Sequence, residues 1–125
     1  MPEFSMLSVI VTDAARGSRA DGVRCLVEHR VDGNWKTVMR GSSDSSGTIS
    51  AARLNSPGIY RVELDTDPYF AASGTITFLP KVTLTFRIPE SCVRSVVSTH
   101  IAPNSQFSVL IRNDGAEETA TPVPG

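Results

Sequence analysis

Few side chains in this sequence could carry acid–base chemistry. Its 125 residues include two histidines, His29 and His100. His100 shares strand parity with Ser98, so an imidazole and a hydroxyl would lie on one face of a strand and could polarise a substrate carbonyl. The alternative is that His100 is a structural or surface residue. We interpret His29, between Glu28 and Arg30, as structural.

The cysteines and serines do not indicate a second chemical centre. Cys25 alternates with Val23 and Val27, which is typical of a buried core thiol, whereas Cys92 falls in an expected loop. No cysteine–histidine spacing in the sequence suits zinc. The serines lack the G-x-S-x-G context of a hydrolase nucleophile. We therefore expect no metal and no cofactor.

Length and charge narrow the class of protein. A chain of 125 residues and 13.4 kDa corresponds to one domain. Its net charge of -1 argues against nucleic acid or an anionic membrane as the main partner. No apolar run reaches the roughly 18 residues needed to cross a bilayer, and the first residues show no signal-peptide pattern. The sequence predicts a soluble, cytoplasmic protein.

Alternating apolar and polar residues predict strands along most of the chain. The strands expected to position a site lie at residues 7–13, 23–31, 35–40, 48–49, 59–65, 81–88, 93–102 and 105–112. Asp67 as an N-cap, Pro68 at the first helical position and Gly74 as a stop predict one short helix. Trp35 and Tyr60 are expected in the core. The pattern predicts an all-β, two-sheet sandwich of about eight strands with one short helix.

Four motifs in the correct order resemble the transthyretin family, which includes the vertebrate hormone carrier and the hydroxyisourate hydrolases of purine breakdown. They are the first strand with its Asp-containing turn (8–18), the strand entering the helix (58–66), the edge strand (80–86) and the Ile-Ala-Pro turn (101–103). The resemblance implies a transthyretin-like domain at residues 7–113. We expect residues 1–6 to be a flexible N-terminus or a cloning remnant, and the acidic residues 114–125 to be a disordered tail.

The resemblance also implies an assembly. Such proteins consist of two four-stranded sheets and dimerise by pairing edge strands. Two dimers then pack face to face into a tetramer with a central channel. Inward positions of the first, seventh and eighth strands line this channel, where ligands or substrates bind. We therefore expect a homotetramer that is a dimer of dimers.

The polar groups that hydroxyisourate hydrolases need in this channel are replaced. Hydrolysis of a polar urate derivative requires a deprotonated water and a hold on an anionic substrate. The family's first-strand His falls on Ile10, its loop Arg on Thr48 and its second His on Val96. The closing Tyr-Arg-Gly-Ser tetrapeptide falls on residues 109–112, which are Val-Leu-Ile-Arg here. These departures indicate that the ancestral hydrolysis has been lost.

The replacements predict an apolar channel with a few hydroxyls and one imidazole, which would recognise shape and apolar area. The expected substrate-binding residues are Ile10, Thr12, Thr48, Val96, Ser98, His100, Phe107, Val109 and Ile111. Thr12, Ser98 and His100 are the candidate catalytic residues, each as a donor to a substrate carbonyl.

Three functions remain as hypotheses. The first is a cyclase of secondary metabolism that folds a hydrophobic polyene or polyketide-like metabolite for a cycloaddition-type, pericyclic reaction. The second is a non-catalytic carrier of an apolar small molecule. The third is a divergent hydroxyisourate hydrolase with rearranged residues. In each case the partner is a small molecule, with no nucleic acid and no membrane.

Overall fold

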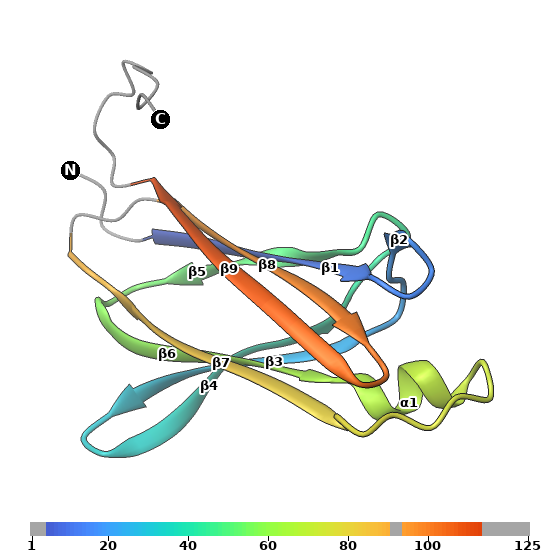
Figure 1. The fold of residues 1–125 in the computed structure, drawn as a ribbon. Coiled ribbons are helices and arrows are strands. Elements are labelled where there is room, and N and C mark those ends of the chain that lie inside the picture. Colours follow the sequence, from blue (N-terminus) through green and yellow to red (C-terminus); the bar gives the residue numbers. More distant parts are fainter. Residues whose placement is uncertain (1–4, 91–93, 114–125) are drawn as a thin grey trace.

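The computed structural model, which describes residues 5–90 and 94–113, consists of two packed sheets and one helix (Figure 1). Its elements are β1 (Ser5–Asp13), β2 (Ser18–Arg19), β3 (Arg24–Val31), β4 (Asn34–Ser42), β5 (Thr48–Leu54), β6 (Gly58–Asp65), α1 (Thr66–Ala71), β7 (Lys81–Ile88), β8 (Arg94–Ala102) and β9 (Ser105–Asn113). The predicted all-β sandwich with one short helix is confirmed.

Each sheet has a defined strand order. Sheet A runs β2-β1-β8-β9, with β5 also paired to β1, and sheet B runs β4-β3-β6-β7. The β1–β8 pair is parallel, whereas the other pairs are antiparallel. The two sheets lie face to face, and α1 lies at one end of sheet B between β6 and β7 (Figure 1).

The core lies between the sheets and is built from every second residue of each strand. Sheet A contributes Val11 and Val97, and sheet B contributes Val27 and Val62, all of them buried. Full burial of each such side chain stabilises the fold by roughly 1.5–3 kcal/mol. Because side chains alternate along a strand, burying one set aims the other set outward. The outward set of sheet A therefore forms a surface of its own.

Strand boundaries differ from the prediction at several ends. β1 begins at Ser5, so Ser5 and Met6 belong to a paired strand and not to the flexible N-terminus predicted for residues 1–6. β4 is also longer than predicted, at Asn34–Ser42.

β2 has only two residues, too few for alternation to reveal it. β5 extends to Leu54 instead of ending near Ile49, and its pairing with β1 shifts register between Leu7 and Val9. This shift breaks the strict alternation that the strand prediction relied on.

The helix start was also predicted wrongly. The helix begins at Thr66, so Asp67 lies inside its first turn instead of capping it. The backbone N–H groups of Thr66 and Asp67 both donate to the carbonyl of Pro80, each at 3.1 Å. The Pro80 carbonyl therefore caps the N-terminus of the helix in place of a local side chain. Because Pro80 is distant in the sequence, a local pattern could not predict this cap.

Three core predictions had different outcomes. Tyr60 is buried, as expected, and Cys25 is 4 % exposed, where burial raises the pKa of its thiol to about 12. The prediction for Trp35 was wrong, because it lies on the outer face of sheet B, with the Arg61 guanidinium 4.0 Å from its ring centroid. Its ring stacks against a cation instead of entering the core.

Some predictions fall on parts of the chain that the structure leaves undescribed. Cys92, residues 1–4 and the tail at 114–125 lie outside the described residues. Within the described ranges, no helix has the length and apolar character that crossing a membrane requires.

Candidate functional site on the outer face of sheet A

Strand register brings the predicted channel residues together on the outer face of sheet A. They form three rows across β5, β1, β8 and β9. The first row holds Thr12, His100 and Phe107; the second holds Thr48, Ile10, Ser98 and Val109; the third holds Ser8, Val96 and Ile111. Ile111 is placed by its backbone pairing with Val96, and its side chain lies outside the described part of the chain.

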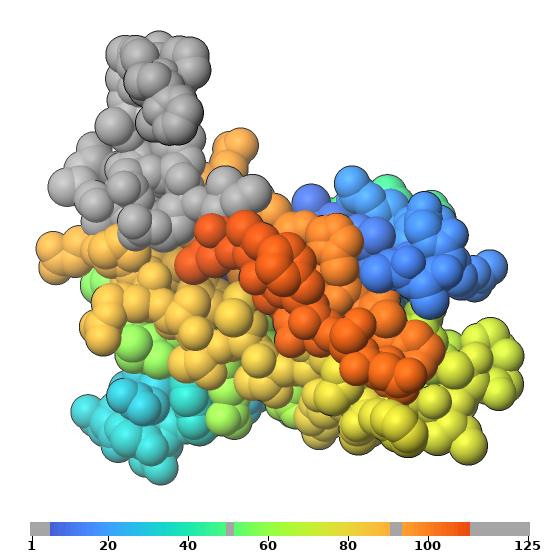
Figure 2. Space-filling model, in the orientation of Figure 1, coloured from blue at the N-terminus to red at the C-terminus, as the bar shows by residue number. Residues whose placement is uncertain are grey.

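Burial confirms which face these side chains occupy. Along β8, Ser95, Val97, Thr99 and Ile101 are buried between the sheets. The alternate residues of β8, including Ser98 and His100, are only partly buried. On the neighbouring β9, Phe107 is 61 % exposed and Val109 is 39 % exposed. In a single chain, the outer face of sheet A thus presents large apolar side chains to solvent. Figure 2 shows β9, in orange-red, at the surface of the molecule.

No aspartate, glutamate, lysine or arginine occurs in the three rows. Arginines lie at their margins. Arg19 pairs in register with Thr12, and its guanidinium donates to the carbonyl of Ser46 at 3.2 Å. Arg53 and Arg94 flank Met6 at the other end of the face. The centre of the face therefore carries hydroxyls, apolar groups and one imidazole, without a fixed charge.

His100 is the one titratable side chain in the rows. Its ring centroid lies 6.1 Å from that of Phe107, at an interplanar angle of 48°. Its Nδ1 atom is buried and has no hydrogen-bond partner among the described residues. No hydrogen bond joins the side chains of Thr12, Ser98 and His100 to one another in the described structure, so these three groups share a face without forming a proton relay.

Residues 5–90 and 94–113 contain no group of three or more His, Cys, Asp and Glu side chains placed to hold a metal ion. The structure does show a hollow that the sequence reasoning missed, on the outer face of sheet B, lined by Arg24 and Arg40 among others. Its signal in the sequence is the second alternating set of β3 residues, which includes Arg24 and Leu26 and which no motif marks as a site.

The parallel β1–β8 pair, the five-stranded and four-stranded layers and the single helix of the described residues define a transthyretin-like sandwich. The model of the HIUase/Transthyretin family matches residues 7–106. The chain belongs to this family.

Individual relatives agree with this assignment. The chain is 26% identical over 100 residues to a protein of Caenorhabditis elegans named "Probable 5-hydroxyisourate hydrolase", covering 78% of this chain and 74% of that protein. It is 26% identical to transthyretin from Sparus aurata, with a TM-score of 0.76 over 86% of this chain and 97% of the other.

Two solved structures at lower identity share the fold. The 5-hydroxyisourate hydrolase of Klebsiella pneumoniae superposes with a TM-score of 0.73 at 22% identity, covering 84% of this chain and 91% of the other. An (S)-allantoin synthase superposes with a TM-score of 0.77 at 21% identity, covering 88% of this chain and 44% of the other.

Proposed function

We propose that this protein binds a largely apolar small molecule against the outer face of sheet A and cyclises it by holding it in a reactive conformation. The observation that carries the proposal is the absence of fixed charge from the three rows, combined with the exposure of Phe107 and Val109. Such a surface gains free energy by burying apolar area, at roughly 25 cal/mol per Å².

The binding site requires assembly. In a single chain the outer face of sheet A is an open sheet surface, and an open surface does not enclose a ligand. The family resemblance implies a tetramer in which two such faces meet around a channel. We propose this homotetramer for the present chain. A second copy facing Phe107 and Val109 would cover the apolar surface and close the site.

The chemistry we propose needs no activated water. Cyclisation of a polyene forms new bonds within one molecule, so atoms balance without an oxidant or a second reactant. Holding the reacting ends together can supply several kcal/mol of the barrier. A hydroxyl of Ser98 or Thr12, or the His100 imidazole, would donate to a substrate carbonyl as charge develops there.

The comparisons support a change of chemistry within this fold. Structures named as a hydrolase, a synthase and a transthyretin all superpose on this chain. The hydrolase and the transthyretin match over 91% and 97% of their own chains, whereas the synthase match covers 44% of that chain and shows the shared fold alone. A fold of this kind does not fix the chemistry of its site, which depends on the side chains of the ligand-binding face. In this chain, the family's hydrolase positions hold Ile10, Thr48 and Val96.

Binding is tested by adding a charge to the face. Val109→Arg is expected to weaken the binding of Nile red, a neutral apolar dye, at least tenfold, because a desolvated guanidinium would oppose an apolar ligand. Fluorescence titration measures the affinity, and size-exclusion chromatography measures the assembly. Thr37→Arg, an exposed position on β4 of the other sheet, should leave both unchanged. Equal affinity of Val109→Arg and the unmodified chain would refute the proposed site.

Chemistry is tested separately from binding. Linear polyenes carrying a conjugated carbonyl should cyclise faster with the protein than in buffer, and Phe107→Ala should change the product distribution. If the protein binds these polyenes but they cyclise no faster than in buffer, the result would instead establish the carrier function. That alternative is favoured by one observation, the absence of a hydrogen bond among the Thr12, Ser98 and His100 side chains. Turnover of 5-hydroxyisourate that is lost in His100→Ala would support the divergent hydrolase.

A further inference from the structure

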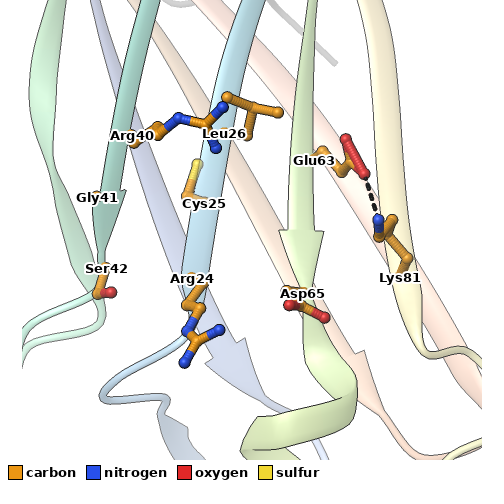
Figure 3. A pocket seen from close by; sticks show the side chains of 9 residues that line it. All are labelled: Arg24, Cys25, Leu26, Arg40, Gly41, Ser42, Glu63, Asp65 and Lys81. Carbon is orange, nitrogen blue, oxygen red and sulfur yellow. Dashed lines mark ion pairs between the residues drawn. The ribbon is translucent and has the colours of Figure 1, made fainter.

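We propose a second ligand site, on the outer face of sheet B, that binds a small molecule carrying a single carboxylate. A hollow of about 470 Å³ opens on this face, a volume suited to a small organic molecule. The residues that define its chemistry are Arg24, Leu26, Arg40, Glu63, Asp65 and Lys81 (Figure 3). They come from four adjacent strands, β3, β4, β6 and β7.

Two arginines supply the binding charge. Leu26 pairs with Arg40 across β3 and β4, and Arg24 is two residues from Leu26 on the same face of β3. Arg24 and Arg40 are thus diagonal neighbours, with β-carbons about 7–8 Å apart or somewhat less, close enough for two long side chains to share one ligand group. Figure 3 shows both side chains on the β3–β4 side of the hollow, with the Arg40 guanidinium beside Leu26 and the Arg24 guanidinium pointing away from it, so Arg24 would have to change rotamer for both to hold one ligand group.

Neither arginine is already committed to another group. In the structure of residues 5–90 and 94–113, the side chains of Arg24 and Arg40 have no ion pair and no hydrogen bond. Elsewhere on the same face Arg61 is paired with Glu28 at 2.6 Å. An unpaired guanidinium has five donors in a planar fork that matches a carboxylate.

The opposite wall sets the charge of the ligand. Lys81 Nζ lies 2.9 Å from Glu63 Oε2, and this contact raises the pKa of the lysine, so the two charges offset each other. Asp65 remains, against the two arginines. The uncompensated charge of the hollow is therefore +1, which a monoanion neutralises. A phosphate dianion would leave one negative charge uncompensated and would cost more free energy to desolvate, so we expect the hollow to prefer a monoanion. Leu26 provides an apolar floor for the rest of the ligand.

The site is independent of the proposed channel. In the assembly implied by the resemblance, sheet A faces inward and the outer face of sheet B faces solvent. A ligand could therefore reach the Arg24–Arg40 hollow with the channel either filled or empty. An experiment that refuted one of the two sites would therefore leave the proposal for the other site standing.

The test uses benzoate, with benzamide as its uncharged analogue and phenyl phosphate as a dianion. Titrations of the full chain followed by ¹⁵N–¹H NMR should show saturable shifts around Leu26 with benzoate, and affinities at least tenfold lower with benzamide. Phenyl phosphate should bind more weakly than benzoate. Arg40→Gln should weaken benzoate at least fivefold. The matched control is Arg87→Gln, an exposed arginine on β7 outside the hollow, which should leave the affinity unchanged.

A second variant keeps the test decisive if Arg40→Gln perturbs the fold. Asp65→Asn removes the opposing negative charge, and the Asp65 side chain makes no helix-capping hydrogen bond, so benzoate affinity should rise at least twofold. Equal binding of benzamide and benzoate would overturn the proposal, as would an equal loss in Arg87→Gln. Tighter binding of phenyl phosphate would overturn the assignment to a carboxylate, and absence of saturable shifts would overturn the site.

Discussion

Replacing Gly47 by alanine is expected to lower the free energy of unfolding by about 3 kcal/mol, one of the two largest effects predicted for a single substitution in this chain. Gly47 has φ +75°. This backbone conformation is energetically unfavourable for any residue that has a β-carbon. A β-carbon built there would lie 2.5 Å from the carbonyl oxygen of Val11 and 2.9 Å from the β-carbon of Arg19. To accommodate this β-carbon, the backbone of β1 at Val11 would have to move.

The effect would extend beyond the turn. Gly47 accepts a hydrogen bond from the Val11 N–H at 2.8 Å, and β1 pairs with β2, β5 and β8. A shift of β1 would therefore disturb the centre of sheet A, including Ile10 and its partner Thr48.

Gly33→Ala is the matched control. Gly33 also has a positive φ, +80°, but a β-carbon there meets nothing within 4 Å. Gly33→Ala should lower the free energy of unfolding by about 1 kcal/mol, which is the cost of the left-handed conformation alone. Urea unfolding followed by circular dichroism gives both values. If Gly47→Ala and Gly33→Ala lost the same stability, the close approach of β1 would not restrict position 47.

Much of the fold was predictable because alternation encodes burial directly. In β8 the sequence Ser-Val-Val-Ser-Thr-His-Ile gives one parity to Val97 and another to Ser98, and the structure buries Val97 in the core and leaves Ser98 partly exposed on the outer face. A two-residue period needs no knowledge of neighbouring strands. The same parity placed His100 and Phe107 correctly on the outer face of sheet A.

Features that depend on register between distant strands were not predictable. The hollow beside Leu26 requires Arg24 and Arg40 to become diagonal neighbours, which the β3–β4 pairing fixes only after a bulge between Val27 and Glu28. The position of Trp35, partly buried on the outer face of sheet B, depends on a cation from β6, Arg61, that lies against its ring. Neither relation exists within one strand, so a pattern along the chain carries no signal for it.

The functional assignment is limited in the same way. The sequence indicates that the outer face of sheet A has lost its charged groups, because each replacement is visible at one position. It contains no pattern that names the ligand, because in the proposed tetramer the surface that encloses the ligand would come from other copies of the chain. The family's hydrolase positions therefore indicate which side chains differ here, and they say much less about the chemistry that the present residues perform.

Asp13→Ala is expected to destabilise the protein by about 3 kcal/mol, since it removes three hydrogen bonds to a buried carboxylate. Asp13 is 1 % exposed. Its Oδ1 accepts from the backbone N–H groups of Ala15 at 3.0 Å and Arg16 at 3.1 Å, and its Oδ2 accepts from the Tyr69 hydroxyl at 2.7 Å. One side chain thus holds the turn after β1 and joins it to α1. Thermal unfolding should show a melting temperature lower by about 10 °C.

Tyr69→Phe removes only the third of these hydrogen bonds and should cost about 1 kcal/mol. Burial, with a further contribution from Asp13, raises the pKa of Tyr69 to about 12 from an ordinary value of 10.0. The stabilisation by this hydroxyl is therefore complete below pH 10 and is lost as the pH rises through 12. The difference in melting temperature between the unmodified chain and Tyr69→Phe should shrink over that interval. A difference that stayed constant from pH 8 to 12 would show that the hydroxyl does not bond to Asp13 in solution.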